Sequence, residues 1–185
     1  ERSEDAVKVY EKVAEIHAEL KNAYYEGLVR NNLANALLKL RRPAEARTQL
    51  LLAVKCLAQF GHNAQMWTIW SNLCDIETAE GNTAAAAEAW QKAIAAYAAY
   101  RRDGGESQSN RFQWIATAAQ TMLAGQTEEL IPDLENILQQ DRPVFVHALC
   151  RALLALLRGS RDPALAEDPE LNYMDVVDLR VVFFG

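Results

Sequence analysis

Apolar residues recur along most of the chain at spacings of three and four, the period of an amphipathic α-helix. No segment shows the sustained alternation of apolar and polar residues that is typical of a half-buried β-strand. Glycines, prolines and polar clusters interrupt the helical pattern and mark turns. We therefore predict an all-α protein with helices over residues 3–20, 24–40, 43–60, 64–80, 83–102, 108–124, 127–140 and 143–158, then an irregular connection over 161–173 and a last helix from about Asp175.

The helical pattern repeats along the chain with a period of roughly 40 residues, a length typical of stacked helical hairpins. Small residues align first, large apolar residues align four positions later, and a further apolar set follows three positions beyond; the sets are Ala6, Ala46, Ala86; Tyr10, Leu50, Trp90; and Val13, Ala53, Ala93. Positions three and four apart share one helix face. A small residue there lets a neighbouring helix approach closely, and a large one fills the space beside it. We expect Ala46, Ala53, Ala86 and Ala93 to be buried where second helices meet their neighbours.

The small-then-large spacing resembles the second helix of the tetratricopeptide repeat family, in its longer variety of roughly 40 residues. The segment Trp70-Ser71-Asn72-Leu73-Cys74 is similar to the W-x-x-L-G signature of that family's first helix. A third, weaker copy around Trp114 follows at a slightly longer spacing. The resemblance implies a right-handed α-solenoid of about three helical hairpins over residues 1–140. Residues 141–185 would form a C-terminal helical cap or extension and continue into a larger protein.

Several residues predict where helices begin and end. Gly81 stands where a helix should stop, and Pro43 stands where one should start. Asp175 is placed to cap the last helix. Pro132 predicts either a kink in its helix or a late start. The run from Val144 to Leu157 is apolar on more than one face, so we expect it to cover the end of the third hairpin.

Composition and charge limit the possible functions. The formal net charge is −6, with 25 acidic and 19 basic residues, whereas a nucleic-acid binder would present a basic surface. No apolar run approaches the roughly 18 residues that span a bilayer, and the charged first residues do not resemble a signal peptide. Three cysteines lie far apart and form no CxxC pair. We expect a cytoplasmic protein with reduced thiols and no nucleic-acid or membrane partner.

Motifs for catalysis, cofactors and metals are absent from the sequence. It contains no GxSxG, no glycine-rich phosphate loop, no HExxH and no DxDxDG. Gly104-Gly105 lacks the lysine that a phosphate loop needs and predicts a helix-ending turn. The acidic residues near Glu167 have irregular spacing, which favours a solvated loop over a metal site. The expectation is a protein that is not an enzyme and has no cofactor.

Polar residues that disfavour helices gather in the predicted first helices. Three asparagines occur within five positions of one helix, although asparagine competes with the backbone for hydrogen bonds. Its amide both donates and accepts, so it can pair with the main chain of an extended peptide. Peptide-binding members of the resembled family use asparagines at such positions. The predicted binding residues on the concave face are Asn31, Asn32, Asn35, Ser71, Asn72 and Asp75.

An alternative for Asn32 and Asn72 is a hydrogen bond between neighbouring helices without any ligand. Trp67 also has two interpretations, since its counterpart in the preceding repeat is Gly27. It either faces a ligand or packs between repeats.

The predicted function is a scaffold module that binds a protein or a peptide. The alternative function is a ligand-sensing regulatory domain of a multidomain signalling protein, which would bind a small molecule or a signalling peptide. Self-association through the helical surface is a further possibility.

Overall fold

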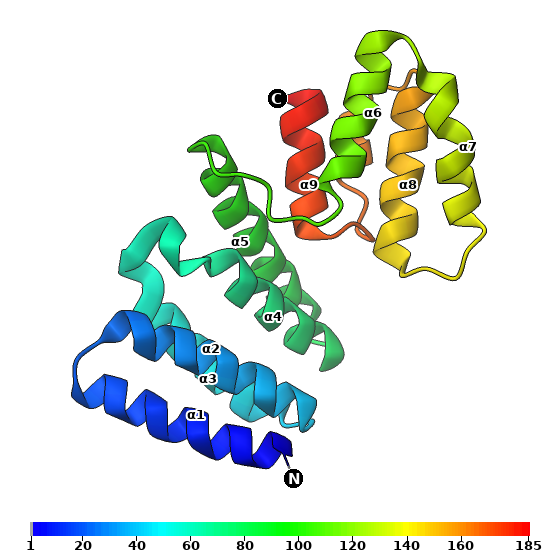
Figure 1. Cartoon of the computed structure of the whole chain (residues 1–185). Helices are drawn as coiled ribbons and strands as arrows, with labels where there is room; N and C mark the ends of the chain where they lie inside the picture. The colour runs from blue at the N-terminus through cyan, green and yellow to red at the C-terminus, as the bar shows by residue number, and fades with distance from the viewer. Residues whose placement is uncertain (1) are drawn as a thin grey trace. The chain divides into compact units, whose positions relative to one another are not determined.

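The computed structural model describes residues 2–185, which form helices and loops without any β-strand (Figure 1). The predicted all-α class is confirmed. The predicted ends of the first eight helices lie within four residues of the observed ones. The elements are α1 (Arg2–Glu19), α2 (Ala23–Lys39), α3 (Pro43–Leu57), η1 (Ala58–Ala64), α4 (Met66–Ala79), α5 (Thr83–Arg102), α6 (Phe112–Ala124), α7 (Thr127–Leu138), α8 (Val144–Leu157), η2 (Pro163–Ala166), α9 (Tyr173–Leu179) and η3 (Arg180–Phe184).

The chain divides between Tyr97 and Ala98, inside α5, into two compact units. Unit 1 contains α1 to α4, η1 and most of α5. Unit 2 contains the end of α5 and all later elements. We predict from the sequence that the helical repeats end at residue 140. This boundary describes the repeat pattern and not the compact units, and it stays a prediction.

Two turns in unit 1 that occupy the same place in successive repeats have the same backbone structure. Arg41 and Gly81 follow α2 and α4 with φ angles of 58° and 77°, in the left-handed region. In each turn the next amide returns to a carbonyl five residues earlier, from Arg42 to Leu37 at 3.0 Å and from Asn82 to Glu77 at 2.8 Å. This pattern ends a helix by satisfying its last carbonyl groups. The stop predicted at Gly81 is confirmed, as is the start of α3 at its first residue, Pro43.

The core of unit 1 forms where α2 contacts α1 and α3, and where α3 contacts α4. Ala46 and Ala53 lie in this core and are fully buried, as predicted. Ala93 is also fully buried and Ala86 is 8% exposed, which agrees with the prediction, whereas Ala6 is half-buried. Because a methyl side chain occupies little space, large neighbours such as Leu50 fill the remaining volume.

Replacing Ala53 by leucine should reduce the free energy of unfolding by about 1–3 kcal/mol, because the added carbons have no free volume to occupy. Chemical unfolding of unit 1 measures this loss. Ala44→Leu on the exposed face of the same helix is the matched control and should change stability by less than about 0.5 kcal/mol. Equal effects of the two substitutions would contradict the packing described for α3.

The structure explains why one repeat position is glycine in the first copy, Gly27, and tryptophan in the next, Trp67. A Cβ atom on Gly27 would lie 2.4 Å from Cγ of Leu57, so only glycine allows α2 to approach α3 this closely. At the counterpart position, Trp67 is 3% exposed and its ring packs edge-on against Tyr97, with ring centroids 5.5 Å apart. The packing interpretation of Trp67 is therefore confirmed.

Unit 2 is built around α8, which contacts α7 and α6; α6 also contacts α9 (Figure 1). The apolar run predicted to cover the third hairpin does pack on the two helices, α6 and α7, that correspond to it. Pro132 lies inside α7, which starts at Thr127, so the predicted alternative of a late start is wrong.

The predicted cap of the last helix is wrong. Asn172 caps α9, because its Oδ1 accepts a hydrogen bond from the Met174 amide at 3.0 Å. Asp175 instead lies in the first turn of α9 and is fully buried. Asparagine and aspartate are both good N-caps, and the sequence alone did not distinguish a capping position from a buried one three residues later.

Candidate functional site

Three of the six predicted binding residues come together on neighbouring helices of unit 1. The Nδ2 atom of Asn72 on α4 donates to Oδ1 of Asn31 at 3.3 Å and to Oδ1 of Asn35 at 3.1 Å, both on α2. Asn31 and Asn35 are four residues apart and share one face of α2, which lets a single amide reach both. All three side chains are half-buried. We call Asn31, Asn35 and Asn72 the amide cluster.

The amide cluster retains hydrogen-bonding groups for another molecule. A primary amide offers two N–H donors and one carbonyl acceptor. Asn31 and Asn35 use their carbonyl oxygens on Asn72, so their NH₂ groups remain. Asn72 uses its NH₂ group and keeps its Oδ1. The cluster therefore presents two donor groups and one acceptor, and the bonds to Asn72 hold both donors in fixed orientations.

The other three predicted residues are not joined to the amide cluster. Asn32 is exposed and Ser71 is half-buried, and the hydrogen bonds among the described residues connect neither side chain to the cluster. Asp75 is an exposed residue one turn after Asn72, yet the protein around its carboxyl group excludes enough water to raise its pKa above the ordinary value. Asn72 does form the hydrogen bond between helices that its alternative describes, and the ligand-free part of that alternative stays a prediction. Asn32 makes no such bond within the described part of the chain.

Unit 2 contains a buried charged network that the sequence analysis missed. Asp175 and Asp178 on α9 are both fully buried. An ion pair joins Asp175 to Arg111 at 2.8 Å, and another joins Asp178 to Arg101 at 2.8 Å. Serine hydroxyls donate to the same carboxylates, from Ser109 to Asp175 at 2.8 Å and from Ser107 to Asp178 at 2.5 Å.

Each buried carboxylate thus holds one arginine and one serine from the end of α5 or the segment between α5 and α6. The sequence did carry a signal for this network, namely two aspartates three positions apart inside the apolar run YMDVVDL. Charged residues are rarely buried without partners, so two aspartates in a buried helix predict partner groups elsewhere in the chain. Burial raises the pKa of both carboxyls, and the neighbouring arginines oppose that rise. The network attaches the connecting segment to α9 and has no exposed carboxylate that faces a ligand.

The thiols have little nucleophilic character. Cys56, Cys74 and Cys150 are free, and burial raises the pKa of each thiol, which lowers the thiolate fraction. Among the side chains that the structure describes, no group of three or more His, Cys, Asp or Glu residues is arranged to hold a metal ion. The helices in the described range include none that is both long and apolar enough to cross a membrane.

Compared with known proteins, the chain matches no family model, no curated protein and no solved structure.

Proposed function

We propose that this chain is a tetratricopeptide-like module that binds the main chain of a partner peptide on the surface around the amide cluster. The observation that carries the proposal is the bridge from Asn72 to both Asn31 and Asn35, which leaves two amide donors and one acceptor in fixed positions. An extended peptide presents carbonyl acceptors and N–H donors along its length. The cluster is complementary to such a main chain and does not require a particular ligand side chain.

The fixed orientation of the amides favours binding. Ordering a free side chain on binding costs about 0.5–1.5 kcal/mol. Here the hydrogen bonds to Asn72 already restrict Asn31 and Asn35, so much of that cost is met when the protein folds. Asparagine is a poor helix former, yet all three residues of the amide cluster lie within helices. A binding role would account for their presence there.

Corresponding positions in successive repeats indicate where self-association would take place. On α3, Gln49 accepts a hydrogen bond from Arg30 of α2 at 2.8 Å. Beyond the end of α3, Phe60 packs against the ring of Tyr24 with centroids 5.1 Å apart. The counterparts of Gln49 and Phe60 in the preceding repeat, Val9 and Leu20, are 59% and 68% exposed. Val9 on α1 and Leu20 just after it are therefore exposed apolar side chains at positions that contact α2 in the next repeat, and they mark the surface on which to look for self-association.

Single Asn31→Asp and Asn35→Asp substitutions test the proposal. Aspartate keeps an oxygen to accept from Asn72 but removes the NH₂ group that would donate to a peptide carbonyl. Peptides selected from a random display library against the 185-residue chain serve as ligands. Each substitution should weaken binding about threefold to tenfold, from the loss of one or two hydrogen bonds of about 0.5–1.5 kcal/mol each, while the melting temperature changes little. Fluorescence polarisation and thermal melts measure the two quantities.

The double variant Asn31→Ala, Asn35→Ala removes the two NH₂ groups that would donate to a peptide. It also removes the two oxygens that accept hydrogen bonds from Asn72. Its affinity should fall tenfold or more, and it should also lose roughly 1–2 kcal/mol of stability. Lys55→Ala with Gln91→Ala, both on exposed positions of other helices, is the control pair. If the aspartate variants bind the selected peptides normally, or the control pair weakens binding instead, the amide cluster only joins α2 to α4 and the proposal is wrong.

A further inference from the structure

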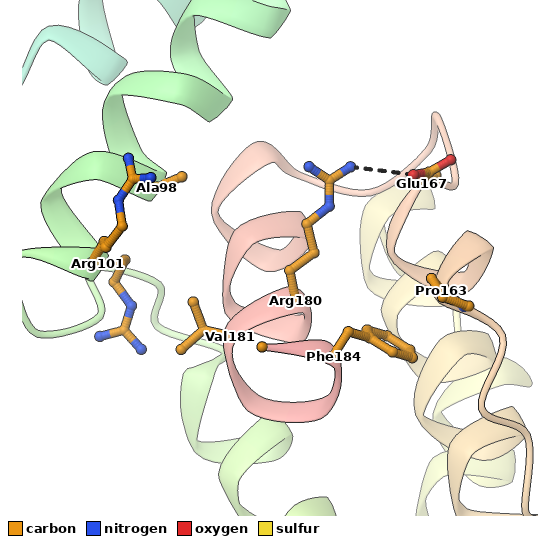
Figure 2. A pocket seen from close by; sticks show the side chains of 9 residues that line it. Ala98, Arg101, Pro163, Glu167, Arg180, Val181 and Phe184 are labelled. Atoms are coloured by element: carbon orange, nitrogen blue, oxygen red, sulfur yellow. Dashed lines mark ion pairs between the residues drawn. The ribbon is translucent and has the colours of Figure 1, made fainter.

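Unit 2 contains an open cleft of ≈ 620 Å³ where η3 lies beside the end of α5 and beside η2 (Figure 2). Its apolar lining comes from Ala98, Pro163, Val181 and Phe184. Figure 2 shows Val181 directed toward the α5 side of the cleft and Phe184 directed toward Pro163. This volume is within the range of roughly 300–1,000 Å³ that is usual for small-molecule sites.

Three arginines line the same cleft and differ in how firmly they are held. Arg101 is mostly buried, pairs with Asp178 and donates to the Gly105 carbonyl at 2.8 Å. Arg180 pairs with Glu167 at 3.8 Å, and both of these side chains are about half exposed or more. For Arg102, which is exposed, the described residues supply no ion-pair partner. A ligand can therefore reach Arg102 directly and can compete with Glu167 for Arg180.

The charge around the cleft selects the kind of anion. Arg101 is paired with Asp178 and Arg180 with Glu167, so Arg102 is the guanidinium in the lining that has no ion-pair partner among the described residues. In the 185-residue chain the terminal carboxylate of Gly185 also lines the cleft. A singly charged anion neutralises Arg102, whereas a dianion would be repelled by Glu167 and by the carboxylate of Gly185. A guanidinium binds a carboxylate with paired, charge-assisted hydrogen bonds. The apolar lining then requires an apolar body attached to that carboxylate.

We propose that this cleft binds a small monocarboxylate with an apolar body, its carboxylate between Arg102 and Arg180 and its apolar part against Val181 and Phe184. The inference is independent of the peptide-binding function, since all of its residues belong to unit 2. Such a site is of the kind that a ligand-sensing domain needs.

Isothermal titration of the 185-residue chain with octanoate tests the site, with three comparison ligands. Octanamide has the apolar body without the charge, acetate has the charge without the body, and inorganic phosphate, with all titrations at about pH 8, is largely a dianion. Octanoate should bind at one site per chain, and the other three should bind at least tenfold more weakly. Equal binding of octanamide, tighter binding of phosphate, or no octanoate binding below its micelle concentration would overturn the proposal.

Variants then place octanoate in the cleft. Arg102→Gln and Arg180→Gln should each weaken octanoate about tenfold, since a hydrogen bond to a charged group contributes more than a neutral one. Glu167→Gln should strengthen it severalfold, because Arg180 loses its competing partner. Arg158→Gln, at the exposed residue that follows α8, is the matched control and should leave affinity unchanged. Unchanged affinity in both Arg102→Gln and Arg180→Gln, with their melting temperatures intact, would show that octanoate binds elsewhere and refute the assignment.

Discussion

A chain that ends at Gln140 should aggregate, or melt well below the full-length protein. The truncation removes α8, which contributes nine buried residues, and α9 with its two buried aspartates. Burying one leucine side chain contributes about 1.5–3 kcal/mol. The five buried leucines of α8 alone thus contribute roughly 10 kcal/mol, which is comparable to the whole stability of a typical domain. Light scattering coupled to size exclusion, and a thermal melt, measure the outcome.

A point substitution separates the packing of α8 from the loss of chain. Leu153 is fully buried, so Leu153→Ala should cost about 2–5 kcal/mol. Leu123→Ala on α6, at a position that is 90% exposed, is the matched control and should cost less than about 0.5 kcal/mol.

A truncated chain that stays monomeric and equally stable would mean that α6 and α7 are self-sufficient, which contradicts the central place of α8 in unit 2.

Asp178→Ala should destabilise unit 2 by about 3–5 kcal/mol. The substitution leaves the guanidinium of Arg101, whose side chain is 10% exposed, without its carboxylate, and it removes the acceptor for the Ser107 hydroxyl. Removing one partner of a buried ion pair has a cost of this size because the remaining charge is then buried alone. Hydrogen exchange at the amides of α6, α8 and α9 reports the stability of unit 2 separately from unit 1.

A surface ion pair in the same unit provides the control. Arg151 pairs with Asp168 at 3.6 Å, and both side chains are about a third exposed or more. Asp168→Ala should therefore change stability by only about 0–1 kcal/mol. Comparable losses in the two variants would show that the contact between Arg101 and Asp178 does not hold the connecting segment on α9.

The pH dependence of unit 2 follows from the same carboxyls. Burial raises the pKa of Asp175 and Asp178 in the folded protein, so the folded state holds their protons to a higher pH than the unfolded chain does. Their contribution to stability is therefore largest below the unfolded value of about 3.9 and is lost as the pH rises through the raised folded values. Asp178→Asn, which does not titrate, should flatten this dependence in hydrogen-exchange measurements across that range.

The sequence by itself determined the all-α class, the limits of eight helices and the buried alanines. These features depend on residues close together in the chain: the spacing of three and four, and the turn residues Gly81 and Pro43. The register of the repeats also indicated which helices correspond to one another in successive repeats. It also selected six candidate binding residues, because helix-disfavouring residues recurred at aligned positions, and three of them, Asn31, Asn35 and Asn72, form the amide cluster.

Only the tertiary structure decided how the polar side chains are paired. Asn72 meets Asn31 and Asn35 because α4 lies beside α2, and their separations of 41 and 37 residues left that contact open. Asp175 satisfied the local rule for a helix cap, yet its partners Ser109 and Arg111 come from a distant part of the chain, before α6, and keep it buried. Whether a charge is solvated or paired depends on which distant group reaches it, and local periodicity does not contain that information.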